Sequence, residues 1–463
     1  MIKRSPSCHA AACLMAATLF LGVSPLYAGS PVTTKPNILI FYVDDMGYGQ
    51  LQCYGNKEIP TPNISALSAS GIRFTQGYVS APLCSPSRAG LLGGHYQERF
   101  AHDNNSLIDE HFLPYPTLAE RLKTLGYVSS AVGKWHLGDI KGQRPTERGF
   151  SEFYGSLQNP GSYFTPKLFI DSHISPDPIK METPGFYTTD AYTDRSVEWI
   201  TKHHDKPWFL YLAYNAVHAP YDATKKYFDR FPNIKDKQLR AFTALFSALD
   251  DGVGRVMKAL KDTGQYDNTI VFFISDNGSP YRDAGMNGPL RGYKWETWEG
   301  GIRVPFMMSW PGKLPAGVTY NQAVINLDVM PTVVVAAGGK VDPTWGLDGV
   351  DLMPYITGKN DGRPNPELDW RLDGRWAARV LDFKLVHMPD KADINKPDRD
   401  KIKPPELFDL SKDIGETHNL APGDPQDVQR LKAQWDAWNS KMAPAPRYEH
   451  KPKNKKNATL EEQ

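Results

Sequence analysis

Four oxygen-bearing side chains lie directly after apolar stretches of the sequence. They fall in two adjacent pairs, after residues 37–43 and after residues 270–275: Asp44, Asp45, Asp276 and Asn277. Carboxylate and amide oxygens are the ligands that hard divalent cations such as calcium and magnesium prefer, whereas zinc favours histidine and cysteine. A single pair of this kind is often only a turn or a helix cap. Two pairs at the ends of two apolar runs instead predict a site for a hard cation.

Basic side chains follow two further apolar runs. Lys134 and His136 come after residues 127–133, and His218 follows residues 208–214. A lysine supplies a point charge to an oxyanion, and a histidine transfers protons near neutral pH. Each of these residues alone could be a solvated surface charge or a buried, hydrogen-bonded histidine. Two basic groups only two residues apart, Lys134 and His136, favour a functional role.

A cysteine and an arginine lie four residues apart in the segment CSPSR, which begins at Cys84. Arg88 could lower the pKa of the Cys84 thiol and favour a reactive thiolate. The same residues would also suit a turn before a helix, with Ser85 as the cap and Pro86 at the first helical position. A disulfide between Cys84 and Cys53, the other cysteine outside the N-terminal segment, is a further alternative.

The four apolar runs have the length and composition of buried strands, and helix-like patterns lie between them. The helices are predicted over residues 61–70, 117–125, 189–202 and 238–262. Alternating strands and helices predict an α/β fold with a large, mostly parallel or mixed sheet that helices cover on both faces. Sites in such sheets form beyond the carboxyl ends of the strands. Four segments that are distant in sequence should therefore bring their polar side chains to one edge of the sheet.

A change in the sequence pattern after residue 355 predicts a second, smaller unit. A turn-rich stretch at residues 360–366 precedes strand-like alternation at residues 375–386 and 406–410 and a helical pattern at residues 428–442. We expect an α+β domain that carries an antiparallel sheet. The predicted organisation is a signal peptide (residues 1–28), a catalytic domain (34–358), a small C-terminal domain (366–446) and a mobile basic tail (447–463).

The N-terminus has the features of an export signal. Lys3 and Arg4 precede an apolar stretch at residues 10–23, and cleavage is expected after Ala28. The apolar stretch is shorter than the roughly 20 residues that a membrane-spanning helix needs, so stable membrane insertion is not expected. A formal net charge of +1 over 463 residues gives no reason to expect nucleic-acid binding. The protein should be exported to the periplasm or the extracellular space.

The segment CSPSR at Cys84 resembles the signature of the sulfatase family, and other motifs of that family occur in the same order along the chain. They are the opening strand with its acidic pair (residues 36–47), GKWHLG (133–138), SDNG (275–278), PLRGYK with EGGIRVP (289–305) and LFDL with Glu416 and Asn419 (407–420). The resemblance covers nearly the whole chain after the signal peptide. Gly93 and Gly94 stand where the family usually has threonine and glycine, a difference that bears on the rim of the pocket rather than on the chemistry.

The resemblance implies an alkaline phosphatase-like fold and a sulfuric ester hydrolase. Cys84 would be oxidised to formylglycine by a formylglycine-generating, sulfatase-maturating enzyme. One calcium ion, with magnesium as the alternative, would be held by Asp44, Asp45, Cys84, Asp276 and Asn277. The implied catalytic residues are Cys84, Arg88, Lys134, His136, His218 and Lys294. Three of these would also bind the substrate: Lys134, His218 and Lys294.

A sulfate monoester is an anion, so its sulfuryl oxygens must be neutralised before a nucleophile can attack. The resemblance implies that the cation, Lys134 and Lys294 do this. A hydrated formylglycine offers one hydroxyl as the nucleophile, and collapse of its second hydroxyl to the aldehyde then expels sulfate. Arg88 is expected to hold the hydrated side chain. His218 matches the position of the acid and His136 the position that assists residue 84, and which of them is acid and which is base stays open.

The expected substrate is a sulfated polysaccharide or its oligosaccharides, because an exported enzyme meets such esters. Small aryl sulfates are the alternative, and a formylglycine-dependent phosphonate or phosphodiester hydrolase is another. A two-zinc phosphoesterase would need additional histidine and aspartate ligands, and an inactive binding protein would be expected to have lost one of the motifs. Candidate residues of the pocket rim are His95, Arg99, His102, Asn104 and Asn287.

Overall fold

The computed structural model describes residues 35–105, 113–280, 287–389 and 403–446. The predicted signal peptide and the predicted basic tail lie outside these residues. No helix in the described ranges is long and apolar enough to cross a membrane.

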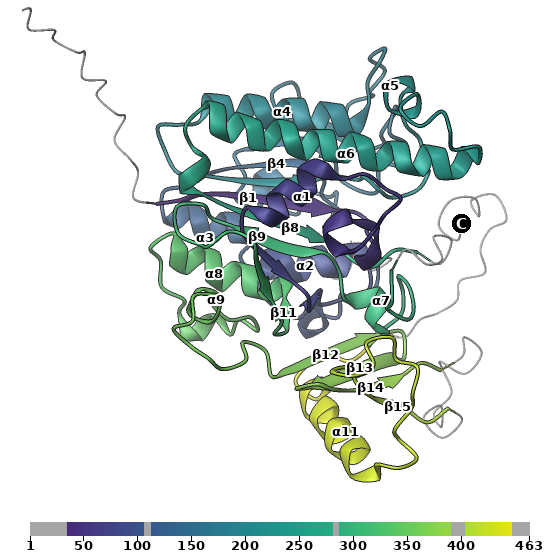
Figure 1. Cartoon of the computed structure of the whole chain (residues 1–463). Helices are drawn as coiled ribbons and strands as arrows, with labels where there is room; N and C mark the ends of the chain where they lie inside the picture. The colour runs from purple at the N-terminus through teal and green to yellow at the C-terminus, as the bar shows by residue number, and fades with distance from the viewer. Residues whose placement is uncertain (1–34, 106–112, 281–286, 390–402, 447–463) are drawn as a thin grey trace, which may run out of the picture. The chain divides into compact units, whose positions relative to one another are not determined.

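A nine-stranded mixed sheet forms the centre of the fold, in the order β10-β2-β9-β8-β1-β7-β4-β5-β6 (Figure 1). Its strands are β1 (Asn37–Val43), β2 (Ile72–Phe74), β4 (Val128–Lys134), β5 (Glu152–Ser156), β6 (Phe169–Asp171), β7 (Trp208–Ala213), β8 (Thr269–Ser275), β9 (Phe306–Ser309) and β10 (Val318–Tyr320). A short parallel pair, β3 (Gly77–Tyr78) and β11 (Val324–Ile325), forms a separate ladder.

The four predicted strands are neighbours in this sheet and run parallel, in the order β8-β1-β7-β4. In the register, Val43 at the end of β1 pairs with Ser275 at the end of β8, and Gly133 of β4 pairs with Ala213 of β7. The carboxyl ends of the four strands therefore meet at one edge, and the predicted fold class is confirmed. Antiparallel pairing enters at β9 beside β8 and at β6 beside β5, which makes the sheet mixed.

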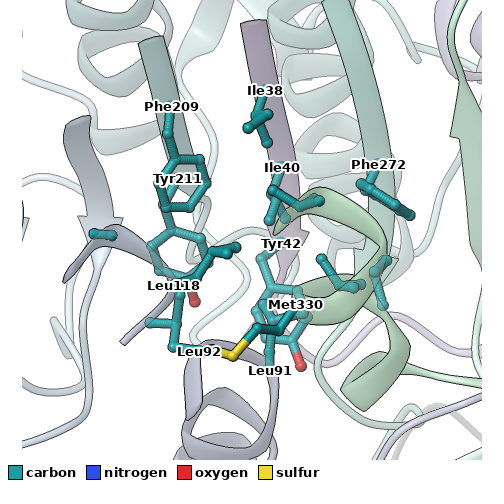
Figure 2. Packing of buried hydrophobic residues seen from close by; sticks show 14 of the residues in the cluster. Ile38, Ile40, Tyr42, Leu91, Leu92, Leu118, Phe209, Tyr211, Phe272 and Met330 are labelled. Carbon is teal, nitrogen blue, oxygen red and sulfur yellow. The ribbon is translucent and has the colours of Figure 1, made fainter. Parts of the chain in front are cut away.

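Both faces of β1 are buried. Successive side chains point to opposite sides of a strand, so alternate residues of β1 enter different cores. Ile38, Ile40 and Tyr42 join one core, and the alternate residues Leu39, Phe41 and Val43 join the other. In Figure 2 the first three residues lie on the same face as Phe209 and Tyr211 of β7. This double burial explains why the strand is an unbroken apolar run rather than an alternating one.

Helices cover the two faces of the sheet. Residues of α2 (Cys84–Gly93), α3 (Leu118–Thr124), α8 (Val329–Ala336) and α9 (Met353–Ile356) pack in the first core. Residues of α1 (Pro62–Ala69), α4 (Thr188–Lys202), α5 (Lys225–Phe228) and α6 (Lys237–Asp262) pack in the second. In Figure 1, α4 and α6 lie above the central strands and α8 and α9 lie below them. The four helices predicted from the sequence correspond to α1, α3, α4 and α6.

The C-terminal part forms a four-stranded antiparallel sheet with one helix. Its elements are β12 (Glu367–Leu372), β13 (Arg375–Val380), β14 (Phe383–His387), β15 (Glu406–Asp409) and α11 (Pro425–Asn439). One face of this sheet packs Trp370 against Tyr78, and the other stacks Trp376 on Trp435 of α11. The predicted linker at residues 360–366 lies between α9 and β12.

The strand predicted over residues 375–386 is wrong as a single element, because the structure divides it into β13 and β14. Leu381 lies in the tight turn between the two strands and has a φ of 56°. The sequence prediction also missed β12, whose charged residues interrupt its apolar pattern.

Candidate active site

Four strand ends deliver polar side chains to one place. Asp44 follows β1 and accepts a hydrogen bond from the Nζ of Lys134, the last residue of β4, at 2.7 Å. Asp276 follows β8, and its Oδ1 accepts a hydrogen bond from the backbone N–H of Asp45 at 3.1 Å. The His218 Nε2 beyond β7 lies 3.5 Å from Oδ2 of Asp45. The structure therefore brings together residues separated by more than 200 positions in the chain.

A glycine permits the close approach of two of these strands beside Lys134. Gly133 has a φ of 113°, and a Cβ built on it would lie 1.9 Å from the carbonyl oxygen of Ala213 in β7. Any other residue would force β4 and β7 apart. The GK pair at the end of β4 thus combines close strand packing with a lysine that points into the site.

Cys84 is the first residue of α2 and is buried, with its Sγ 3.4 Å from Oδ1 of Asp44 and 3.7 Å from Oδ1 of Asp45. Burial, together with the negative charge of Asp276, raises the pKa of the Cys84 thiol well above its usual range. The expectation that Arg88 could favour a thiolate here is therefore wrong. Cys53 is also a free thiol, so the alternative of a disulfide between Cys53 and Cys84 is wrong as well.

The helix begins earlier than predicted, because Leu83 rather than Ser85 is its N-cap. The Ser85 hydroxyl instead donates to the backbone oxygen of His136 at 2.7 Å, and it lies 2.7 Å from Nε2 of His102. Ser85 thereby ties the N-terminus of α2 to the loop after β4. The N-terminus of a helix carries partial positive charge, so α2 would favour an anionic ligand bound beside residue 84.

Arg88 lies one helical turn after Cys84 and is fully buried. Its Nε and NH2 groups donate to Oδ2 of Asp276 at 3.1 and 2.6 Å, and NH1 donates to the backbone oxygen of Lys134 at 3.0 Å. The guanidinium also lies over the ring of Tyr42 at 5.4 Å. These partners satisfy the buried charge, which would otherwise be very costly.

Two lysines form ion pairs with the acidic pair after β1. Lys294, in the loop before α7 (Glu299–Ile302), lies 2.7 Å from Oδ1 of Asp45, and the side chains of both residues are 4% exposed. Burial alone would raise the pKa of Asp44, but the positive charge of Lys134, followed by His218, holds that pKa well below its usual range. Burial would likewise raise the pKa of Asp45, but the positive charge of Lys294 lowers it below its usual value. Both carboxyl groups are therefore ionised.

The acidic cluster fits a divalent cation. Ligand atoms of four buried residues lie within 4.8 Å of one another: Asp44, Asp45, Cys84 and Asp276. Asn277 donates from Nδ2 to Oδ1 of Asp45 at 2.7 Å, while its own buried Oδ1 has no hydrogen-bond partner among the described residues. Burial and then the negative charge of Asp44 raise the pKa of Asp276 to about 7. A set dominated by oxygens suits calcium or magnesium.

The two histidines differ in their surroundings. His136 is buried with a φ of 58°, and its Nδ1 has no hydrogen-bond partner in the described part of the chain. Burial, and then Lys134, lower the pKa of His136 well below its usual value, so the ring is neutral. The His218 side chain is 16% exposed, and its Nδ1 lies 2.5 Å from the carbonyl oxygen of Ala219. We infer that Nδ1 donates this bond, which leaves Nε2 directed towards Asp45.

Asn159 is a site residue that the sequence prediction missed. Its Nδ2 lies 3.3 Å from Nε2 of His218. It belongs to the loop between β5 and β6, and no apolar run or charged neighbour in the sequence marks it out. Only the folded chain brings that loop to His218.

The five predicted rim residues have mostly internal contacts. His95 is buried, with its ring nitrogens 2.7 and 2.8 Å from two backbone oxygens. Asn287 is also buried and accepts a hydrogen bond from the backbone N–H of Ser279 at 3.1 Å, so it joins two loops rather than lining a rim. The other three also contact neighbouring side chains. Arg99 pairs with Asp348, His102 lies beside Ser85, and Asn104 donates a hydrogen bond to Asp373.

Comparisons with known proteins point to one family. The sulfatase family model matches residues 36–339. Mouse arylsulfatase J is 36% identical over 356 residues, which cover 74% of this chain and 58% of that protein. Human arylsulfatase A is 33% identical over 466 residues, which cover 89% of this chain and 90% of that protein. The crystal structure of Ps i-CgsB in complex with k-i-k-neocarrahexaose has a TM-score of 0.79 and 32% identity, with 88% of this chain and 94% of that chain covered.

The fold and the buried acidic site define an α/β hydrolytic enzyme of the alkaline phosphatase-like class. Within this class, the chain belongs to the sulfatase family, whose members are sulfuric ester hydrolases.

Proposed function

We propose that this chain is an exported, formylglycine-dependent sulfatase that hydrolyses sulfate monoesters of a sulfated polysaccharide or its oligosaccharides. The observation that carries the proposal is the position of Cys84, at the N-terminus of α2 and 3.4 Å from Asp44. The likeness to Ps i-CgsB, which was crystallised with a neocarrahexaose, supports a carbohydrate substrate. The likeness to arylsulfatases J and A supports small aryl sulfates as the second candidate.

The residues around Cys84 suit an anionic substrate. Lys134 and Lys294 place two ammonium groups on opposite members of the acidic pair, within hydrogen-bonding distance of Asp44 and Asp45. A third source of positive potential is the N-terminus of α2. Buried charges act strongly because little water screens them. These groups would bind the sulfuryl oxygens and stabilise the charge that develops on them.

The chemistry proposed for residue 84 is that of formylglycine rather than of a buried thiol. A formylglycine at this position would supply, once hydrated, both the nucleophile and a second hydroxyl whose collapse releases sulfate. A calcium or magnesium ion held by Asp44, Asp45, Asp276, Asn277 and residue 84 would supply positive charge to the sulfuryl group and lower the pKa of a bound hydroxyl. Arg88 fixes Asp276 and the start of α2, and thereby orients residue 84.

The histidines would carry the protons. A sugar hydroxyl is a poor leaving group unless it is protonated as it departs. We assign this donation to the doubly protonated form of His218, whose Nε2–H would face Asp45 at 3.5 Å. Burial lowers the pKa of His218, and the negative charge of Asp45 acts against that shift and favours the charged ring. We assign to His136 the acceptance of a proton from residue 84, because its ring is neutral and its Nδ1 has no partner among the described residues.

The test combines two measurements on protein that is coexpressed with a sulfatase-maturating enzyme. Mass spectrometry of the peptide that contains residue 84 should show formylglycine. Sulfate release should occur from sulfated oligosaccharides and be lost in Cys84→Ala, whereas Cys53→Ala, which removes a thiol outside the site, should retain it.

A thiol at residue 84 in active protein would exclude the formylglycine mechanism. Preferential turnover of aryl sulfates would favour the second candidate. Preferential turnover of phosphonate monoesters or phosphodiesters would replace the sulfatase assignment altogether.

A further inference from the structure

Trp295 is an exposed aromatic residue beside a site lysine. It follows Lys294 directly, is 38% exposed and does not belong to any of the hydrophobic clusters of the described residues. Its φ is 71°, a left-handed conformation that bulky residues rarely adopt. Such conformations persist where the surroundings impose them, and they concentrate at functional sites. Core packing therefore does not explain the position of Trp295, and a functional role is the alternative.

The backbone of Trp295 is held on two sides. Its N–H donates to the carbonyl oxygen of Pro82 at 2.9 Å, two residues before Cys84. Its carbonyl oxygen accepts a hydrogen bond from NH1 of Arg375 in β13 at 3.0 Å. The segment that leads into α2 and the C-terminal sheet thus fix the same residue from different directions.

The far end of the loop is fixed as well. The backbone N–H of Glu299, the first residue of α7, donates to Oε2 of Glu416 at 2.7 Å. Lys384 of β14 lies 2.9 Å from a carboxylate oxygen of each of these glutamates, and all three side chains are fully buried. Residues 295–299 are therefore held at both ends by residues of the C-terminal part, which fixes the backbone that carries the Trp295 ring.

The ring of Trp295 lies next to the position proposed for the sulfate. Its centroid is 4.8 Å from Nζ of Lys294, and the same Nζ is 2.7 Å from Oδ1 of Asp45. A group bound to the Lys294 ammonium from the solvent side would extend along an exposed aromatic surface. Carbohydrate rings present apolar C–H faces that pack on such surfaces, and a rigid aromatic ring offers that area at a low cost in conformational entropy.

We propose that Trp295 is a stacking platform for a sugar ring of the substrate, in the subsite next to the sulfate. The inference rests on the proposed function, because it assumes that Lys294 binds the sulfate. In this proposal Trp295 binds the sugar ring and so favours sulfated carbohydrates as substrates, while Lys134 and Lys294 bind the sulfate itself.

The test is a set of variants assayed with sulfated hexasaccharides of carrageenan and of glycosaminoglycans. Trp295→Leu removes the aromatic face and should raise KM by about tenfold or more, with kcat nearly unchanged. Trp295→Phe keeps a ring and should restore most of the affinity. Trp345→Leu is the matched control, since this partly exposed tryptophan also lies over a cation, Arg121, at 3.8 Å, and it should leave KM unchanged.

The inhibition constant of inorganic sulfate, which lacks a sugar ring, distinguishes two roles of Trp295: stacking on a sugar and positioning of Lys294. It should be the same in wild type and Trp295→Leu. A weaker inhibition by sulfate with a fall in kcat would overturn the platform in favour of a role in positioning Lys294.

An unchanged KM in Trp295→Leu, in a wild type that cleaves the hexasaccharides, would overturn the platform alone. A wild type that cleaves aryl sulfates but neither binds nor cleaves any hexasaccharide would overturn the platform and the carbohydrate substrate together, while the sulfatase chemistry would stand.

Discussion

Arg88 and Asp276 form an ion pair that is completely buried, with NH2 2.6 Å from Oδ2 and both side chains 0% exposed. The pair joins the helix that begins at Cys84 to the end of β8. It therefore links the position of the proposed nucleophile, residue 84, to the position of a predicted cation ligand. Because both partners lie in the interior, removal of either one would leave the other buried without its partner.

Replacement of Arg88 should affect stability and activity together. Arg88→Gln leaves the Asp276 carboxyl buried without its partner. Such a change costs about 3–5 kcal/mol in comparable cases when the remaining group stays charged, so the loss should grow as pH rises above 7 and Asp276 ionises. Arg88→Lys keeps the charge but cannot make both hydrogen bonds to Asp276, so an intermediate loss of stability and activity is expected. Urea unfolding and sulfate release under saturating substrate measure the two effects.

Arg255→Gln is the control for loss of an arginine. Arg255 pairs with Asp194 on the surface, where the two side chains are 46% and 63% exposed. Exposed pairs of this kind contribute about 0–1 kcal/mol. Equal unfolding free energies for Arg88→Gln and Arg255→Gln would contradict the structural role assigned to Arg88.

Cation binding should stabilise the folded protein through the acidic cluster. A ligand that binds only the native state adds about 4 kcal/mol at a concentration 1,000 times its Kd. Chelation should therefore lower Tm, and addition of calcium should restore it. Calorimetric titration of the chelated protein should give one site per chain, and magnesium should compete for it.

Asp45→Asn tests whether the predicted ligands provide that stabilisation. It removes one carboxylate of the cluster and should reduce the rise in Tm with calcium. Asp194→Asn, which removes an exposed carboxylate, should leave the rise unchanged. A rise in Tm that is the same in Asp45→Asn and wild type would place the cation elsewhere.

The sequence predicts the centre of the sheet well and its margins poorly. The strands β1, β7 and β8 are six or seven residues long and buried along their whole length, so an apolar run marks each of them. By contrast, β2 and β10 are three residues long, too short for a periodic pattern to appear. These short strands form because the fold brings their segments beside strands that are already in the sheet, and the local sequence does not show this.

The same distinction applies to the site. Asp44 and Asp276 were predictable from the residues alone, because parallel strands place their carboxyl ends at one edge of the sheet. Lys294 has no preceding strand and could be assigned only through its resemblance to a family motif. Asn159 and Trp295 lie in irregular loops whose positions depend on distant contacts. The high pKa of the Cys84 thiol was missed because the sequence shows its charged neighbour but not its burial.

The stability of the C-terminal part should depend on pH through Asp369. This residue of β12 accepts a hydrogen bond at Oδ2 from Gln434 of α11 at 2.7 Å, and its buried Oδ1 has no partner among the described residues. Burial, and then the negative charge of Glu367, raise the pKa of Asp369 from 3.8 to about 7. Since the folded-state pKa is the higher one, the stabilisation is full below the unfolded-state pKa and is lost as pH rises through the folded-state pKa.

Asp369→Asn removes this titration and should gain stability relative to wild type as pH rises. Because one pKa unit corresponds to about 1.4 kcal/mol, the difference in unfolding free energy should change by about 2.6 kcal/mol between pH 5 and pH 8. Urea unfolding of both proteins at several pH values measures it. Asp436→Asn, at an exposed carboxylate on α11 that pairs with Lys432, controls for the loss of one negative charge. A constant difference across this range would show that Asp369 keeps the same charge in the folded and unfolded states.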